Sequence, residues 1–531
     1  MSTGLNTVRR VNPWLIAAAV VIPTFMEVLD TTIANVALRY IAGGLSAAQV
    51  DSEWVITSYL AANAIVLPIS GWLLTRLGRR NYFLMSMGVF TLSSFLCGIA
   101  SSLNELILFR VLQGLAGGGL QPCTQGVLLD TFPKEKQGQA MAVFGVAALV
   151  APVVGPTLGG YITDNYSWRW IFFINVPVGG FALLACYLLV EDPPYLKAER
   201  EQMRLNPKPF DFVGLLLLSI TMVCWEVVLS KGQEWDWFGD PFYRIQILSA
   251  LFVGCLFGLI FRELRTSAPL INLRPLTDRN FVIGSLIIAC AYAVLYAQSV
   301  SLPALLQSLF GYDATHSGLV LSPAGIFAII LLPVVAALLG KGMDARWLII
   351  IGLAFMALGN YWLSQMNLDI GPWDVVWARV VTIIGLSILF SPLSVAVYQN
   401  IPPHLRGAAV GIFSLLRNEG GSVGTSNAQT IQERREQFHL LRLNEYLDPL
   451  NPALTSYFAQ VRAGLYGLFG DPAGSDAMAY QVIDDLRQQQ AASLAYFDVF
   501  WVCGVLAALL IPAVLLMRRS VAEKGATLAA D

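Results

Sequence analysis

Long apolar stretches alternate with short polar segments along almost the whole chain. A helix that crosses a membrane needs about 20 apolar residues, because each residue rises about 1.5 Å and the hydrocarbon layer is roughly 30 Å thick. Such a helix satisfies its backbone hydrogen bonds within its own segment, as lipid demands. Fourteen stretches therefore predict transmembrane helices: Trp14–Val36, Trp54–Leu74, Tyr82–Ala100, Leu106–Leu128, Ala140–Ile162, Trp170–Val190, Phe212–Leu229, Ile245–Phe261, Phe281–Val300, Gly318–Leu339, Trp347–Met366, Val375–Val397, Ala408–Ser426 and Leu494–Leu516.

The loops between these stretches differ in their content of lysine and arginine. With both termini in the cytoplasm, most basic residues fall in cytoplasmic loops, and the short outer loops hold only Arg39, Arg169, Lys231 and Arg244. A missing or extra span would invert every later loop and destroy this asymmetry. The charge pattern therefore supports fourteen spans with both termini on the cytoplasmic side.

The two parts of the chain repeat each other at an offset of 269 residues. The matching pairs are Gly71 and Gly340, Arg110 and Arg379, Pro133 and Pro402, Gly138 and Gly407, Phe144 and Phe413, and Gly155 and Gly424. Parallel repeats of this kind relate the halves of a transporter about the membrane normal. The pattern predicts an all-α membrane protein with two six-helix halves and two inserted helices. The predicted units are an N-terminal half (1–190), a linker with the inserted helices (191–265), and a C-terminal half (266–531) with a periplasmic loop (429–492).

The outer segment Gln429–Ala492 is unusually long. It carries two polar helical stretches, Ile431–Tyr446 and Ala477–Gln490, and Asp-Pro and Asn-Pro pairs between them are typical of turns. The segment is either a docking element or a solvated loop.

Composition agrees with a membrane protein and argues against other classes. Hydrophobic residues make up 56% of the chain and charged residues 13%, too few to cover a water-soluble globule of this size. The net charge of -2, without a long basic run, argues against nucleic acid as a partner. The seven cysteines lie in apolar runs and the three histidines are far apart, so no disulfide, metal site or cofactor is expected.

Several ionisable residues lie inside the predicted spans. Glu27 and Asp30 share one face of the first span, where removal from water and the like-charged neighbour both favour the protonated form. Arg110 in the fourth span needs a carboxylate partner, which the first span offers. Glu226 and Glu419 are further candidates for proton coupling or for structural roles, and Arg417 could partly satisfy Glu419.

The fifth span contains a run of small residues and prolines, namely Pro152, Gly155, Pro156, Gly159 and Gly160. Small residues allow close contact between helices, and prolines bend the helix axis. The run predicts a gating helix, although a plain packing face is the simpler alternative.

The sequence Gly420–Gly424 matches the hydrolase pattern G-x-S-x-G, but it lies in a hydrophobic span rather than between a strand and a helix. We therefore expect no catalytic nucleophile there, and no enzyme.

Five segments together resemble one family. They are Leu29–Ala37, Gly71–Arg80, Arg110–Gly114, Pro152–Gly160 and Trp168–Pro177. They are similar to motifs of the major facilitator superfamily, specifically its fourteen-helix drug/proton antiporter branch and the EmrB-type inner-membrane pump subunits. One position departs from the pattern: Thr75 stands where the cytoplasmic-loop motif commonly has Asp, and an Asp recurs at the repeat-related position 344.

The resemblance implies a function and partners. It implies export of small hydrophobic or amphipathic compounds in exchange for protons, by a protein in the lipid bilayer of the inner membrane. It also implies a periplasmic membrane-fusion adaptor and a TolC-like outer-membrane channel. A proton-independent facilitator or importer of a single metabolite is the alternative.

The resemblance also assigns roles to residues. It implies proton coupling at Asp30 and Arg110 and antiport through the Pro152–Gly160 run. The cytoplasmic-loop motif is represented by Gly71, Arg76, Gly78 and Arg79.

Overall fold

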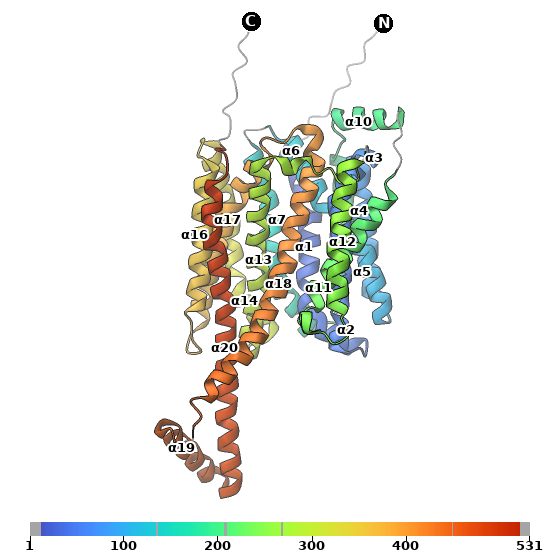
Figure 1. The fold of residues 1–531 in the computed structure, drawn as a ribbon. Coiled ribbons are helices and arrows are strands. Elements are labelled where there is room, and N and C mark those ends of the chain that lie inside the picture. The colour runs from blue at the N-terminus through green and yellow to red at the C-terminus, as the bar shows by residue number, and fades with distance from the viewer. Residues whose placement is uncertain (1–11, 134–135, 206–209, 267–268, 449, 521–531) are drawn as a thin grey trace, which may run out of the picture.

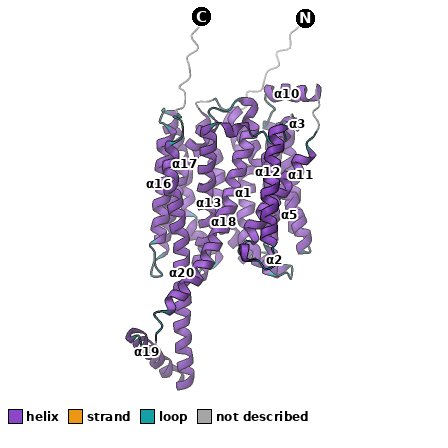
Figure 2. Cartoon of the chain, viewed as in Figure 1, coloured by secondary structure: helices purple, strands orange, loops and turns teal. Residues whose placement is uncertain are grey.

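The computed structural model describes residues 12–520 except 134–135, 206–209, 267–268 and 449, and this part of the chain is helical without any strand (Figures 1 and 2). The α-helices are α1 (Pro13–Gly44), α2 (Gln49–Ser52), α3 (Trp54–Leu77), α4 (Arg79–Ile99), α5 (Leu103–Gly117), α6 (Leu120–Thr131), α7 (Gln137–Asn165), α8 (Trp170–Phe173), α9 (Asn175–Leu189), α10 (Pro194–Leu205), α11 (Phe212–Lys231), α12 (Arg244–Arg265), α13 (Arg279–Ser308), α14 (Ala314–Leu321), α15 (Pro323–Gly340), α16 (Ala345–Ser364), α17 (Pro372–Tyr398), α18 (Arg406–Asn444), α19 (Pro452–Phe469) and α20 (Pro472–Leu515). Short 3-10 helices cover Trp237–Gly239, Arg274–Thr277 and Pro403–Leu405.

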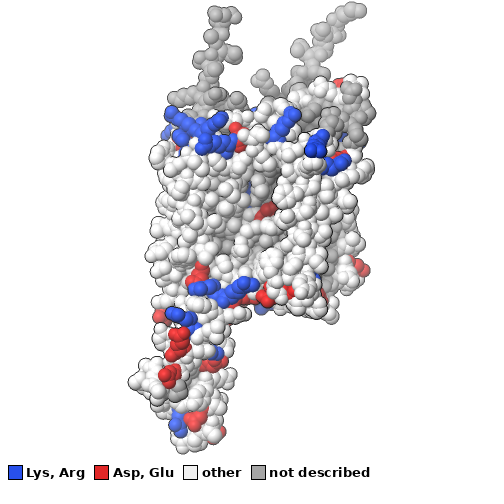
Figure 3. Space-filling model, in the orientation of Figure 1, with Lys and Arg blue, Asp and Glu red and all other residues white. Residues whose placement is uncertain are grey.

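The long helices form one bundle and run roughly parallel to each other (Figure 1). We call the end where α1 begins and α20 finishes the termini side, and the opposite end the stalk side, because part of the chain extends beyond the bundle there. Charged side chains gather at two levels of the visible face, and an almost uncharged band separates them (Figure 3). This distribution is what a membrane-spanning bundle requires, since lipid-facing positions cannot solvate charge.

Twelve helical segments among the described residues are long and apolar enough to cross a membrane. Two further predicted spans correspond to helices that this criterion omits. The span Leu106–Leu128 is divided into α5 and α6 by Gly118 and Gly119, so neither piece is long enough. The span Ala408–Ser426 lies in α18, where charged side chains interrupt the apolar sequence.

Helices α3 and α7 connect the first part of the bundle to the last. Helix α3 packs against α18, and α7 packs against α14, α15 and α17. The α3–α18 contact is very close: a Cβ atom added at Gly71 would lie 2.7 Å from the carbonyl carbon of Gly407. Glycine is therefore required at this contact, because any side chain would push the two backbones apart.

The inserted helices α11 and α12 pack against each other, and α11 also contacts α3 and α18. Only 11% of the apolar window of α12 is buried, so most of this helix faces lipid. Arg262 in the last turn of α12 donates to Asp211, the N-cap of α11, over 2.8 Å. Helix α11 is thus the member of the pair that touches the rest of the bundle.

The outer segment is more helical than the sequence predicts. Its two polar stretches are continuations of α18 and α20, and α19 occupies the middle, where we expected turns. Two of the proline pairs mark helix starts: Asn451 and Asp471 cap α19 and α20, and a proline follows each in the first turn. The third pair, at 448–449, extends outside the described residues. We call residues 429–492 the stalk, and they project from the bundle in Figure 1.

Candidate functional site

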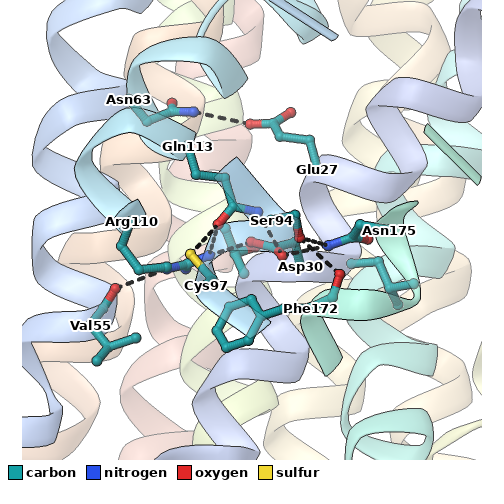
Figure 4. A network of polar contacts seen from close by, with 12 residues as sticks. Glu27, Asp30, Val55, Asn63, Ser94, Cys97, Arg110, Gln113, Phe172 and Asn175 are labelled. Carbon is teal, nitrogen blue, oxygen red and sulfur yellow. Dashed lines mark hydrogen bonds and ion pairs between the residues drawn. The ribbon is translucent and has the colours of Figure 1, made fainter. Parts of the chain in front are cut away.

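The carboxylate of Asp30 is enclosed by three side chains from two other segments of the chain (Figure 4). Arg110 on α5 forms an ion pair with Asp30 Oδ2. Gln113 Nε2 and Asn175 Nδ2 donate to Asp30 Oδ1 over 3.0 and 2.7 Å. Asp30 is 2% exposed, and its hydrogen-bond partners among the described residues lie on α5 and α9. The carboxylate therefore links α1 to α5 and α9.

Arg110 is completely buried, as the sequence leads one to expect for a cation in an apolar span. Its Nε donates to the backbone carbonyl of Val55 over 3.0 Å, and its Nη1 donates to Gln113 over 2.9 Å. The guanidinium also lies 4.2 Å from the ring centroid of Tyr59. A buried guanidinium is tolerated only with such partners, and Asp30, rather than Glu27, supplies the opposite charge.

Glu27 lies one helical turn from Asp30 and has different surroundings. Asn63 Nδ2 donates to its Oε1 over 3.2 Å, whereas its Oε2 is buried without a hydrogen-bond partner in the described part of the chain. Glu27 is 2% exposed and lines the central cavity. Of the two acids on this face of α1, Asp30 therefore forms the buried ion pair and Glu27 lines the cavity.

The central cavity has a volume of about 1170 Å³, including the part that is open to solvent. Side chains of α1, α3, α11, α13 and α18 line it, and its wall combines aliphatic groups with the rings of Tyr59, Tyr292 and Tyr296. Its lining extends to Glu53 and Gln429 on the stalk side. Polar and charged side chains, among them Glu27, Asn63 and Arg417, make up much of the rest of the wall. A concave site that combines apolar surface with convergent polar groups is the usual form of a small-molecule site.

Contacts between helices close the bundle on the termini side. Asp130 at the end of α6 accepts from Arg79 over 2.7 Å and from Arg406 over 3.3 Å, so one carboxylate joins α4 to α18. Tyr195 donates to the same carboxylate over 2.7 Å, and Tyr398 donates to Gln125 over 2.9 Å. The structure is therefore closed on this side while the cavity extends toward the other.

The residues of the cytoplasmic-loop motif have separate places in this closure. Gly71 lies at the α3–α18 contact, and Gly78 ends α3 with a φ of 85°, a conformation that favours glycine. Arg79 joins the ion-pair network, whereas Arg76 lies 5.2 Å from the ring of Trp72. Asp344, the repeat-related acid, caps α16 and pairs with Arg346 over 2.8 Å.

The small residues of α7 fit against two different helices. A Cβ atom at Gly155 would collide with Thr32 of α1, and one at Gly160 would lie 2.8 Å from the backbone of Ala314 in α14. Gly159 lies against Ile33, and Pro152 and Pro156 are inside the helix. The run therefore lets α7 pack closely between α1 and α14.

The remaining candidates meet around α11 and α18. Ser422 donates to Glu226 over 3.0 Å, and Glu226 lies within hydrogen-bonding range of Glu419. Arg417 does not pair with Glu419, which corrects one interpretation of the sequence. Residues two positions apart on a helix point in different directions, and the Arg417 guanidinium lies 5.4 Å from the rings of Phe144 and Tyr292.

In the described part of the second half, the repeat-related arginine has no equivalent of the Asp30–Arg110 pair. Arg379, the repeat-related arginine, is 2% exposed and bonds to Gln298 and Ser299, without a carboxylate among the described residues. The repeat in the sequence therefore preserves the arginine but not its charge partner.

Sequence reasoning did not single out Gln113, Asn175, Asn63 or Asp130. Gln113 and Asn175 lie within motifs that the family resemblance quotes, so polar residues inside those apolar spans were the available signal. Gln113, Asn175 and Asn63 each contact an acid of α1, whereas Asp130 pairs with two arginines on the termini side. Only the folded bundle shows these contacts.

Comparison with known proteins agrees with this architecture. The family model of the Major Facilitator Superfamily matches residues 20–425. The Multidrug export protein EmrB of Haemophilus influenzae is 37% identical over 492 residues, covering 92% of this chain and 93% of the relative. The Fatty acid resistance protein FarB of Neisseria gonorrhoeae is 34% identical and covers 93% of this chain and 94% of its own.

Two solved structures show the same fold at low sequence identity. The proton:xylose symporter XylE bound to 6-bromo-6-deoxy-D-glucose has a TM-score of 0.59 and 14% identity, over 94% of both chains. The human organic anion transporter MFSD10 has a TM-score of 0.55 and 13% identity, over 94% of this chain and all of that one. The predicted major facilitator fold is confirmed. The chain belongs to the major facilitator superfamily of membrane transporters and, within it, to the family of the EmrB multidrug export proteins.

Proposed function

We propose that this protein is a proton-coupled antiporter that exports hydrophobic or amphipathic toxic compounds across the inner membrane by alternating access. One observation carries the proposal: an ionisable carboxylate, Asp30, is enclosed with Arg110 in the middle of the bundle, one turn from the cavity-lining Glu27. Intramembrane acids are costly and are typical of proton pathways. The names of the multidrug export relatives support the export of such compounds.

The orientation follows from the basic residues. We assign the termini side to the cytoplasm, because lysine and arginine concentrate in the loops there. The cavity then extends toward the periplasm, and the Asp130 network closes the cytoplasmic side. In the alternative conformer this network opens and the stalk side closes. The small residues of α7 would allow that helix to slide between α1 and α14.

Proton coupling would act through the contacts of α1. Protonation of Asp30 removes the charge that holds Arg110, so the link between α1 and α5 weakens. Loss of the proton restores the ion pair and the present arrangement. Asp30 is assigned as the proton carrier and Arg110 as its counter-charge. Glu27 lies on the same face of α1 and is assigned as the acid that lines the cavity.

The test uses inverted membrane vesicles and a hydrophobic fluorescent dye. The wild type should accumulate the dye when a proton gradient is imposed, whereas Asp30→Asn should not. Asp51→Asn, at an exposed position of α2, is the matched control and should behave as the wild type. Gradient-driven accumulation by Asp30→Asn would show that the proton carrier is another acid. Equilibration without a gradient by the wild type would favour the facilitator alternative.

The stalk supports a further part of the proposal, docking of a periplasmic membrane-fusion adaptor that leads to a TolC-like outer-membrane channel. Several of its large apolar side chains are exposed although they lie outside the bundle; they are Leu441, Tyr446, Leu468, Phe469 and Tyr480. Exposed apolar groups rimmed by polar ones mark interaction sites. Deletion of α19 should abolish co-purification of the adaptor while membrane insertion is retained. Unchanged co-purification would place the docking site elsewhere.

A further inference from the structure

A pair of carboxyl groups lies in the cavity wall away from the Asp30 site. Glu226 comes from the inserted helix α11 and Glu419 from α18, and they lie within hydrogen-bonding range of each other. Glu226 is 3% exposed and lines the cavity. Glu419 lies next to Trp225 outside the cavity lining, and its Oε2 is buried without a donor among the described residues.

Two carboxyl groups in contact cannot both be ionised at low cost, because like charges repel strongly in a poorly solvated site. They can form a hydrogen bond with each other only when one of them holds a proton. Neither has a basic partner in the described structure: Ser422 bonds to Glu226, and Trp225 is next to Glu419. The pair therefore needs either a shared proton or a cation.

The other charged and titratable groups around the cavity do not meet that need. They are Glu27, Glu53, Arg417, Tyr59, Tyr292 and Tyr296. Arg417 acts on the charge of Glu27 without forming an ion pair among the described residues, and Glu53 pairs with Lys231 over 2.7 Å. None of these groups forms an ion pair with Glu226 or Glu419 among the described residues, so the carboxyl pair keeps its own need for a proton or a cation.

We propose that Glu226 and Glu419 form a proton/cation exchange site, at which the positively charged head group of an amphipathic organic cation replaces the shared proton. Glu226 contacts the cation from the cavity wall, and Glu419 is a positioning residue that holds the proton in the empty state. The net charge of the site is unchanged by the exchange, since one positive charge replaces another. The tyrosine rings of the cavity supply further surfaces suited to a cation.

The inference rests on the proposed export function and adds a substrate class to it. It also gives the inserted helices a chemical role. Helix α11 is held to α3 and α18 by bonds one turn after Glu226, because Ser230 contacts Thr57 at 2.5 Å and Ser426 donates to the carbonyl of Leu229 over 2.6 Å. These contacts fix the carboxyl group of the inserted helix in the wall of the central cavity.

The experiment measures binding to the purified full-length protein in detergent, so it does not depend on transport. The probe is tetraphenylphosphonium, with uncharged triphenylphosphine oxide as the neutral comparison. Binding of the cation to wild type should release up to one proton, read from a pH indicator in weak buffer. Its affinity should rise by up to about tenfold per pH unit where the pair still holds its proton.

The variants separate the two roles. Glu226→Gln should weaken the binding of tetraphenylphosphonium at least tenfold and abolish proton release, while the binding of triphenylphosphine oxide stays unchanged. Glu419→Gln should keep cation binding and extend it to lower pH, because the like-charged neighbour is gone. Glu436→Gln, farther along α18 and outside the cavity lining, is the matched control and should behave as wild type.

Unchanged affinity and proton release in Glu226→Gln would overturn the proposal. Cation binding without proton release at any pH, or no binding of the cation by wild type, would overturn it as well. Loss of gradient-driven dye export with intact exchange in this assay would instead contradict the antiport function and leave the site standing.

Discussion

Replacement of Arg110 by methionine should destabilise the protein through the carboxylate that it leaves behind. Arg110 is fully buried and Asp30 is 2% exposed, so the variant strands a charge that water cannot reach. Removal of one partner of such a pair typically costs about 3–5 kcal/mol. Asp30 keeps its bonds from Gln113 and Asn175, which places the expected loss near the lower end of that range.

The loss should depend on pH in a defined direction. In the Arg110→Met variant Asp30 can escape its buried charge by taking up a proton, which is easy at low pH. The cost of that proton grows by up to about 1.4 kcal/mol per pH unit, so the destabilisation should increase as the pH rises. The double variant Arg110→Met/Asp30→Asn has no stranded charge, and it should recover most of the loss at every pH.

The assay can use cysteines that the fold already hides. All seven are free thiols, and Cys97, Cys123, Cys186, Cys224 and Cys503 are buried, so a thiol-reactive dye reports unfolding on heating. Wild type, both single variants and the double variant are compared between acidic and alkaline pH. The ion-pair reasoning would be refuted if the Arg110→Met variant were as stable as the wild type at alkaline pH. It would also be refuted if the double variant were less stable than Arg110→Met.

Two further predictions concern the termini side. Asp130→Asn loses the charge shared by Arg79 and Arg406, so it should shift the protein toward opening on this side. Spin labels at the C-terminal end of α3 and the N-terminal end of α18 should then lie farther apart. An unchanged distance distribution would show that the Asp130 ion pairs do not hold this side closed. Gly71→Ala should cost about 1–3 kcal/mol in thermal unfolding, because the added methyl group meets the backbone of α18, whereas the repeat-related Gly340→Ala meets nothing within 4 Å and should be close to neutral. Equal effects of the two alanines would show that the close contact is not a constraint.

The local features of the bundle could be predicted from the sequence, because each depends only on residues close together in the chain. Apolar length and loop charge located the spans, and an arginine inside an apolar span implied a buried acid as partner. The stalk was predicted less well, since Asn451 and Asp471 look like turn residues until the proline after each is seen to begin a helix. The same residue types stop one helix and start the next, and only the chain that follows decides between these outcomes.

What the sequence by itself determined is the class of molecule: a helical membrane protein with repeated halves, and acids and arginines in its apolar spans. The tertiary structure decided which of those charges meet. Asp30 rather than Glu27 pairs with Arg110, and Glu419 faces Glu226 of the inserted helix rather than Arg417. The reason is physical: burial follows from the composition of a single segment, whereas a charge pair depends on the rotation and depth of two helices, which packing across the whole bundle sets.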